Sequence, residues 1–148
     1  MERIMGLDMY LYAADDEYID MVKKHVASGY ETDDLNDYYD KHGSIDHVYW
    51  RKANAIHHFF CEYGECIDSQ TYYIVTRDQL EKLCDKCSEV LVDHDKADYK
   101  LPTQSGFFFG SLEYNEYYFS KIVYTLENLA VFLERYKDKT KFLYYASW

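Results

Sequence analysis

Two short segments carry the polar side chains that are best suited to hold a ligand. The first contains Arg51, Lys52, Asn54 and His57 among apolar and aromatic residues. An arginine guanidinium is a planar fork that suits a phosphate or a carboxylate. A lysine held close to a core can present its ammonium to a ligand or a substrate. These residue types therefore indicate a site for a small polar, anionic ligand.

The second segment, at positions 101–111, reads LPTQSGFFFGS. It places polar groups directly before a glycine, and exposed backbone N–H groups in such a turn can hold an anion. It lacks the lysine and the spacing of a P-loop. We expect the turn to face the first segment across a pocket, although a purely structural turn is the alternative. The expected ligand site consists of Arg51, Lys52, Asn54, His57, Gln104, Ser105 and Gly106.

The same basic residues also have an ordinary structural interpretation. Lys52 would extend along the protein surface to water, and His57 would bond a backbone carbonyl. Arg51 would pair with a nearby acid, Asp46 or Glu62. Catalysis with His57 as a general base and Lys52 as an electrostatic catalyst is conceivable, but the sequence contains no GxSxG, HExxH or GxGxxG motif.

The cysteines form two pairs, Cys61-x4-Cys66 and Cys84-x2-Cys87, with spacings that zinc sites use. Cys84 and Cys87 fall on the apolar stripe of an expected helix, however, where thiols are ordinary core residues. We expect mostly buried free thiols, no bound metal and no cofactor.

Hydrophobic periodicity predicts one α+β domain over residues 1–148. We expect an antiparallel sheet of three to four strands packed against about four helices, with the first and last strands in one sheet that the final helix covers. The 93–105 stretch reads as a polar loop, and Thr76 and Gln79 have capping-box spacing. The expected strands are Ile4–Tyr12, Thr71–Val75 and Lys141–Ala146, and the expected helices are Asp15 or Asp16 to Ser28, Asp46–Tyr63, one from Thr76 onwards and Asn115–Tyr136.

With a net charge of −11, the chain lacks the basic surface that is typical of a nucleic-acid binder, so we expect no direct nucleic-acid contact. Much of this charge lies between Asp15 and Asp46. Four of its acids are expected outside the core, where they would meet a basic partner protein: Asp33, Asp34, Asp37 and Asp40. Asp8 interrupts the apolar N-terminal stretch, and no apolar run is long enough for a membrane span. These features predict a cytoplasmic protein with no membrane contact.

Five blocks resemble a family of small uncharacterised proteins encoded by bacteriophages and bacterial genomes. The blocks are GLDMYLY from Gly6, YWRKANAIHHFF from Tyr49, YIVTRDQLEKL from Tyr73, LPTQSGFFFGS from Leu101 and YNEYYF from Tyr114. The resemblance implies a phage or prophage setting in the host cytoplasm, but no activity, substrate or catalytic residue. The cysteines are not part of its pattern.

Three classes of function follow. The first is an accessory protein that binds a small anionic or nucleotide-like ligand, in a phage setting to counter host defence. The second is an acidic inhibitor that docks on a host defence protein, as anti-CRISPR proteins do. The third is a small enzyme acting on a nucleotide. Binding without catalysis is the interpretation that the residues favour, and the oligomeric state stays open, with a homodimer among the alternatives.

Overall fold

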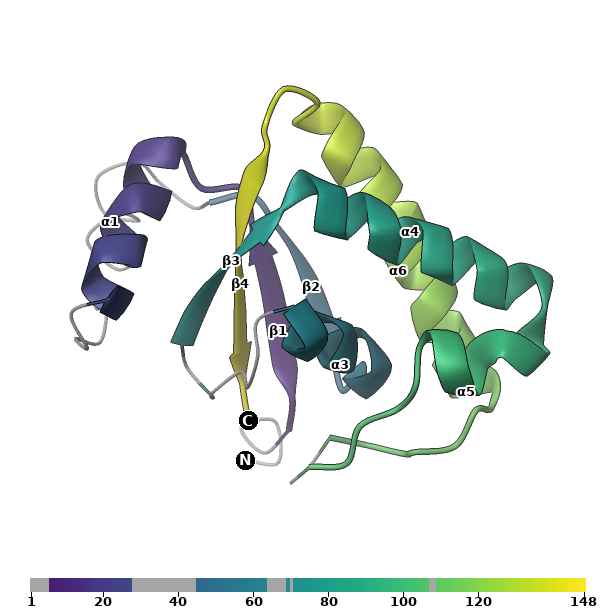
Figure 1. The fold of residues 1–148 in the computed structure, drawn as a ribbon. Coiled ribbons are helices and arrows are strands. Elements are labelled where there is room, and N and C mark those ends of the chain that lie inside the picture. Colours follow the sequence, from purple (N-terminus) through teal and green to yellow (C-terminus); the bar gives the residue numbers. More distant parts are fainter. Residues whose placement is uncertain (1–5, 28–44, 64–68, 70, 107–108) are drawn as a thin grey trace.

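The computed structural model describes residues 6–27, 45–63, 69, 71–106 and 109–148. Within these residues the chain forms one antiparallel sheet of four strands, in the order β2-β1-β4-β3, together with five α-helices (Figure 1). The strands are β1 (Asp8–Tyr12), β2 (His47–Arg51), β3 (Thr71–Thr76) and β4 (Lys141–Ser147). The α-helices are α1 (Asp16–Ala27), α3 (Asn54–Tyr63), α4 (Arg77–Val92), α5 (Ala97–Lys100) and α6 (Glu116–Arg135). The expected α+β class is confirmed.

The strands from the two ends of the chain lie side by side at the centre of the sheet. Met9 of β1 is opposite Ala146 of β4 on one side and opposite Trp50 of β2 on the other. The prediction that these strands share a sheet is therefore confirmed. Successive side chains of a strand point to opposite faces, so Met9 and Leu11 point to one face while Tyr10 and Tyr12 point to the other.

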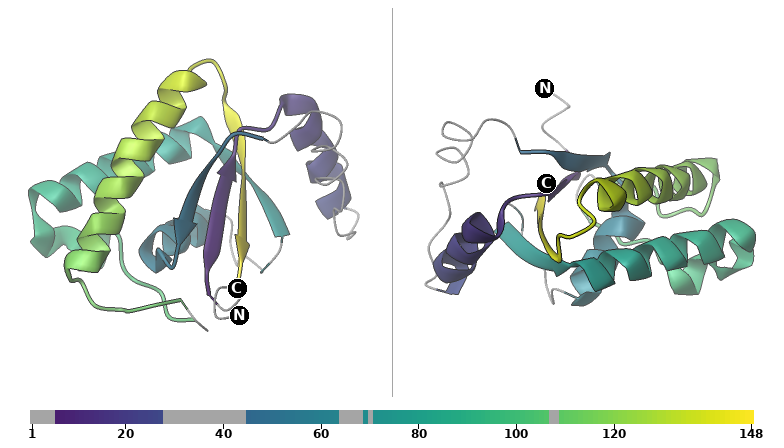
Figure 2. Two further views of the ribbon diagram at one scale, coloured as in Figure 1. Left: turned by 180° about the vertical axis from the view of Figure 1, so that it is seen from behind. Right: turned by 90° about the horizontal axis from the view of Figure 1, so that it is seen from above.

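The helices divide between the two faces of the sheet (Figure 2). The larger core joins the Met9 face to α3, α4 and α6, and includes Ile56, Leu83 and Leu129. As predicted, the final helix α6 covers this face. Its Thr125 hydroxyl accepts a hydrogen bond of 2.8 Å from the indole nitrogen of Trp50 in β2. A smaller core forms where α1 packs on the opposite face, and it consists of Tyr12, Ala14, Tyr18, Ile19, Val22, Ile45, Tyr72 and Leu143.

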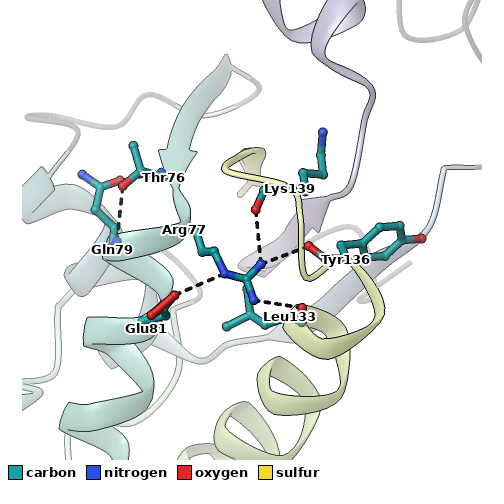
Figure 3. Close-up of polar contacts among 7 residues, drawn as sticks. All are labelled: Thr76, Arg77, Gln79, Glu81, Leu133, Tyr136 and Lys139. Atoms are coloured by element: carbon teal, nitrogen blue, oxygen red, sulfur yellow. Dashed lines mark hydrogen bonds and ion pairs between the residues drawn. The ribbon is translucent and has the colours of Figure 1, made fainter.

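Arg77 joins the start of α4 to the end of α6 (Figure 3). Its Nη1 donates to the carbonyls of Tyr136 and Lys139 at 3.0 and 3.2 Å, and its Nη2 donates to the carbonyl of Leu133 at 3.0 Å. Its Nε lies 3.2 Å from Glu81. The last carbonyls of a helix have no partner within the helix, so one guanidinium satisfies the end of α6 and fixes it against α4.

The predicted capping box at the start of α4 is confirmed. The N–H of Gln79 donates to the hydroxyl of Thr76, and the N–H of Thr76 donates to the side chain of Gln79. The predicted strand at Thr71–Val75 and the predicted final helix are also confirmed, within one residue at each end.

One expected helix is wrong in its first half. Residues 47–51 form strand β2, and the helix begins only at Asn54. The pattern HVYWR alternates with a period of two: Val48 and Trp50 are buried, whereas His47 and Tyr49 are exposed. Pairing with β1 stabilises the extended conformation of these residues. Lys52, which follows the strand, has a left-handed backbone with φ of 55°, a conformation that does not occur within a right-handed α-helix.

Two loop expectations have different outcomes. Residues 93–105 were expected as a polar loop, but they contain a 3-10 helix (His94–Lys96) and α5, which buries Ala97. The segment at positions 101–111 was expected to contain a turn. The N–H of Phe109 donates to the carbonyl of Gly106 at 3.2 Å, and the described residues of the segment form no strand. Among the described residues, no helix is long and apolar enough to cross a membrane.

Candidate functional site

The site begins at the junction between β2 and α3. The N–H of Lys52 donates to the carbonyl of Leu7 at 2.7 Å, which continues the sheet bonding one residue past β2. The left-handed backbone of Lys52 then reverses the chain into α3. Gly110 lies directly against its side chain, because a Cβ added to Gly110 would come within 3.3 Å of the Lys52 Cβ. The junction thus meets the segment that follows α5.

Asn54 connects the same junction to that segment by three hydrogen bonds. Its Nδ2 donates to the carbonyls of Phe109 at 3.2 Å and Ser111 at 3.0 Å, and its Oδ1 accepts from the N–H of Gln104 at 3.1 Å. The side chain is buried, and every polar atom of the amide has a partner. Asn54 therefore holds the 104–111 segment against the start of α3.

A pocket of about 210 Å³ lies between this junction, the segment after α5 and the start of α6. Its inner walls are apolar, with Ala53, Ile56 and Ile122 among them, whereas its polar groups come from three separate stretches of the chain. The lining residues are Lys52, Ala53, Asn54, Ala55, Ile56, Thr103, Gly110, Ser111, Glu113, Tyr117, Tyr118, Lys121 and Ile122.

Two lysines, Lys52 and Lys121, line this pocket, and we refer to them as the lysine pair. Both are half-buried, and neither ammonium has a hydrogen bond or ion pair within the described part of the chain. Desolvation and, second, the charge of Lys52 lower the pKa of Lys121. Two positive charges therefore act on the same small space, and Glu113 supplies a carboxylate among the lining residues.

His57 belongs to the core and does not line the pocket. It is 1% exposed, its Nδ1 lies 2.6 Å from the hydroxyl of Tyr144, and its ring packs edge-on against Phe109 and Trp148. Burial, with a smaller contribution from His58, lowers the pKa of His57 to about 4. The imidazole is neutral at physiological pH and holds α3 to β4, so its partner is a tyrosine and not the expected backbone carbonyl.

Arg51 is paired with an acid, as the structural interpretation anticipated, but with a different one. Its Nη1 lies 2.9 Å from Asp8 of the neighbouring strand β1, and Asp8 also accepts a hydrogen bond from the hydroxyl of Tyr49. The two expected acids are engaged elsewhere: Asp46 with Arg135, and Glu62 with His58. Arg51 does not contribute to the pocket lining.

The expected turn meets the site only indirectly. Gln104 bonds Asn54 through its backbone N–H, and its buried Oε1 has no donor among the described residues. Ser105 and Gly106 are exposed and do not line the pocket. Of the seven expected ligand residues, the structure places Lys52 and Asn54 in the pocket wall and Gln104 directly behind it.

Sequence reasoning missed Lys121, Glu113 and Tyr117. Lys121 had a recognisable signal, since it lies three residues after Tyr118 and four before Thr125, so it shares the inward face of α6 with two buried residues. Glu113 lies just before the N-cap of α6 and Tyr117 lies in its first turn, where polar residues are common, so their types alone indicate no site.

The remaining candidates lie elsewhere in the fold. Among the described residues no disulfide joins Cys61, Cys84 and Cys87, of which Cys87 is buried and the other two are half-buried. Burial raises the pKa of Cys84 to about 11, so its thiol is protonated at neutral pH. No metal-binding group of three or more His, Cys, Asp or Glu occurs among the described residues. Cys66 and the expected partner-binding residues Asp33, Asp34, Asp37 and Asp40 lie outside the described residues.

Comparisons with models of protein families, with curated proteins and with solved structures found no match for this chain. The resemblance to phage and prophage proteins therefore stays a prediction. The pocket and its charges are the observations on which a function can be proposed.

Proposed function

We propose that the protein binds a small anionic ligand in the pocket between the start of α3, residues 103–113 and the start of α6. The observation that carries this proposal is the lysine pair, Lys52 and Lys121, which lines one pocket together with Glu113, while neither ammonium forms an ion pair or a hydrogen bond among the described residues. A bound carboxylate or phosphate would lie near both ammonium groups.

The charge balance of the chain supports this interpretation. The protein has 27 acidic residues for 16 basic ones, so acids are plentiful as partners for cations. Several other basic side chains do have such partners, in the pairs Arg51–Asp8, Arg77–Glu81, Lys100–Glu89, Arg135–Asp46 and Lys139–Asp16. Two like charges in a partly desolvated pocket repel each other. An anionic ligand would remove this repulsion, and so its binding would be favoured.

The size of the pocket limits the ligand. At about 210 Å³ it is smaller than the pockets that typically hold drug-sized molecules, roughly 300–1,000 Å³. It suits a small carboxylate or phosphate compound, or the phosphate-bearing part of a nucleotide. In the phage setting that the resemblance implies, such a ligand would be a host signal molecule, captured to counter defence.

Calorimetric titration tests the proposal, with inorganic phosphate and AMP as probes. Charge-assisted hydrogen bonds contribute about 1.5–3 kcal/mol each, so Lys52→Met and Lys121→Met should each weaken binding roughly tenfold or more. Lys23→Met is the matched control, because it removes the same charge from an exposed position on α1, on the other side of the sheet. Its affinity should equal that of the wild type.

Two results would contradict the proposal: no binding of either probe by the folded wild-type protein, or equal affinities for all three lysine variants. Mass spectrometry of small molecules released from the purified protein would identify a natural ligand directly. Thermal unfolding of each variant, measured alongside, separates lost binding from lost folding.

A further inference from the structure

The position of Lys121 in the pocket points to a chemical reaction. We infer that the amine of Lys121 forms an imine with the carbonyl group of a small anionic carbonyl compound, such as a 2-oxo acid, while Lys52 holds the anionic group. This inference rests on the proposed anion site and adds a covalent step to it.

The geometry of Lys121 suits a reacting amine. It projects from α6, a 20-residue helix whose start is capped by Asn115, so its backbone position is fixed. Its neighbours on the inward face, Tyr118 and Thr125, are buried. The pocket wall around it includes the apolar side chains of Ala53, Ile56 and Ile122. This combination of a rigid base and apolar surroundings limits both the hydration and the motion of the amine.

The two lysines have different roles in the proposed reaction, because Lys52 holds the anion and Lys121 supplies the reacting amine. The titratable groups that line the pocket with Lys121 are Lys52 from the β2–α3 junction, Glu113 from the segment before α6, and Tyr117 and Tyr118 from the first turn of α6. Desolvation and the charge of Lys52 both disfavour the ammonium form of Lys121 and lower its pKa. A desolvated lysine beside another cation is one of the recognised forms of an activated amine nucleophile. Lys52 holds the anionic group, whereas the lowered pKa of Lys121 gives it a larger fraction of neutral amine.

The reaction balances without an oxidant or a reductant. The nitrogen lone pair of neutral Lys121 attacks the carbonyl carbon, a C–N bond forms, and the carbonyl oxygen takes up a proton to give a carbinolamine. The nitrogen loses one proton as the carbinolamine forms. The hydroxyl then takes up a second proton and leaves as water while the nitrogen lone pair forms the C=N bond, and loss of the remaining N–H proton gives the neutral imine. Glu113 and the hydroxyl of Tyr117 line the same pocket and are the groups available to exchange these protons.

Reductive trapping tests the inference. The full chain is incubated at neutral pH with pyruvate and sodium cyanoborohydride, which converts an imine into a stable amine, and the modified lysines are located by peptide mass spectrometry. We expect Lys121 to be labelled several-fold faster than Lys137, which is exposed after the end of α6. Hydroxyacetone, a neutral ketone of similar size, should label Lys121 more slowly than pyruvate does. Phosphate should protect Lys121 by competing for the site.

Variants separate the roles of the two lysines. Lys121→Arg keeps the positive charge but cannot form the imine, so pyruvate labelling above the level of exposed lysines should disappear. Lys52→Met should slow the labelling of Lys121 by pyruvate, since both the anion contact and the activating charge are lost. The comparison of pyruvate with hydroxyacetone on the wild-type protein needs no variant, so the test stands even where a substitution impairs folding.

The outcomes distinguish this inference from the proposed function. If phosphate binds at the lysine pair but pyruvate labels Lys121 no faster than Lys137, the imine inference is wrong and the anion site stands. If phosphate neither binds nor protects, and both ketones label Lys121 at the rate of exposed lysines, both proposals are wrong.

Discussion

The side-chain amide of Asn54 donates a hydrogen bond of 3.0 Å to the backbone carbonyl of Ser111. This bond crosses from the start of α3 to the far end of the LPTQSGFFFGS segment, and two more bonds from the same side chain reach Phe109 and Gln104. A single buried residue thus determines where one wall of the pocket lies.

Replacing Asn54 should therefore destabilise the protein and release the pocket wall. Asn54→Ala leaves buried backbone groups without partners, so the free energy of unfolding should fall by about 2–3 kcal/mol. Asn54→Asp has nearly the same shape but sets a carboxylate against two carbonyl oxygens, so it should be at least as damaging. Urea denaturation measures both, and faster amide exchange in residues 104–111 would locate the effect. Asn128→Ala, which removes a bond to the carbonyl of Tyr124 within α6, should cost less than about 1 kcal/mol; equal losses would contradict the assigned role.

Arg77 makes a second long-range connection, which a substitution that keeps the charge but changes the shape of the side chain can test. Arg77→Lys keeps the charge but loses the fork that reaches three carbonyls at the end of α6. We expect the free energy of unfolding to fall by about 2 kcal/mol. Glu81→Gln removes only the exposed ion pair with Arg77 and should change stability by less than about 1 kcal/mol. Thermal or urea unfolding decides, and a larger effect of the Glu81 substitution would show that the ion pair matters more than the carbonyl contacts.

The sequence predicted those elements whose periodicity is long and undisturbed. The stripe of α6 and the capping box of α4 are local signals, and both appear where they were expected. The segment HVYWR is different: read together with the following helix, its apolar residues fit a helical face, and only pairing with β1 selects the strand. The alternation within HVYWR is compatible with a strand, but it is short, so tertiary pairing decides between strand and helix.

The site was predicted only in part for the same reason. Lys52 and Asn54 were recognised because polar residues stood among apolar ones. Lys121 joins them from a position 69 residues after Lys52 in the sequence, and the tertiary fold alone brings the two ammonium groups to one pocket. His57 was misread because its polar type suggested chemistry, whereas its hydroxyl partner Tyr144 lies on a distant strand.

The buried His57 should make stability depend on pH. Its pKa is about 4 in the folded protein and about 6.5 in an unfolded chain, so between these values the unfolded chain binds a proton that the folded protein excludes. Stability should therefore fall as the pH drops through this window, with a contribution from His57 of about 2 kcal/mol between pH 7.5 and pH 5. His57→Gln should lower stability at pH 7.5 yet show a correspondingly weaker loss on acidification. Urea denaturation at both pH values measures this, with exposed His47→Gln as the control; parallel pH profiles for the wild type and His57→Gln would contradict the assignment.

The left-handed backbone of Lys52 allows stability and binding to be separated at one position. A non-glycine residue at φ of 55° bears a steric cost of about 1–2 kcal/mol, which glycine avoids, although glycine also loses more backbone entropy on folding, about 0.5–1 kcal/mol. Lys52→Gly should thus be as stable as the wild type or more stable by up to about 1 kcal/mol, while phosphate binding weakens roughly tenfold or more. Lys52→Met removes the same charge but keeps the strain, so binding should weaken to a similar degree without any gain in stability. Paired urea denaturation and calorimetric titration measure both quantities. If Lys52→Gly is clearly less stable than Lys52→Met, the packing of the Lys52 side chain against Gly110 stabilises the protein by more than the left-handed conformation costs. The ammonium group would then not be the reason why a residue other than glycine occupies this position.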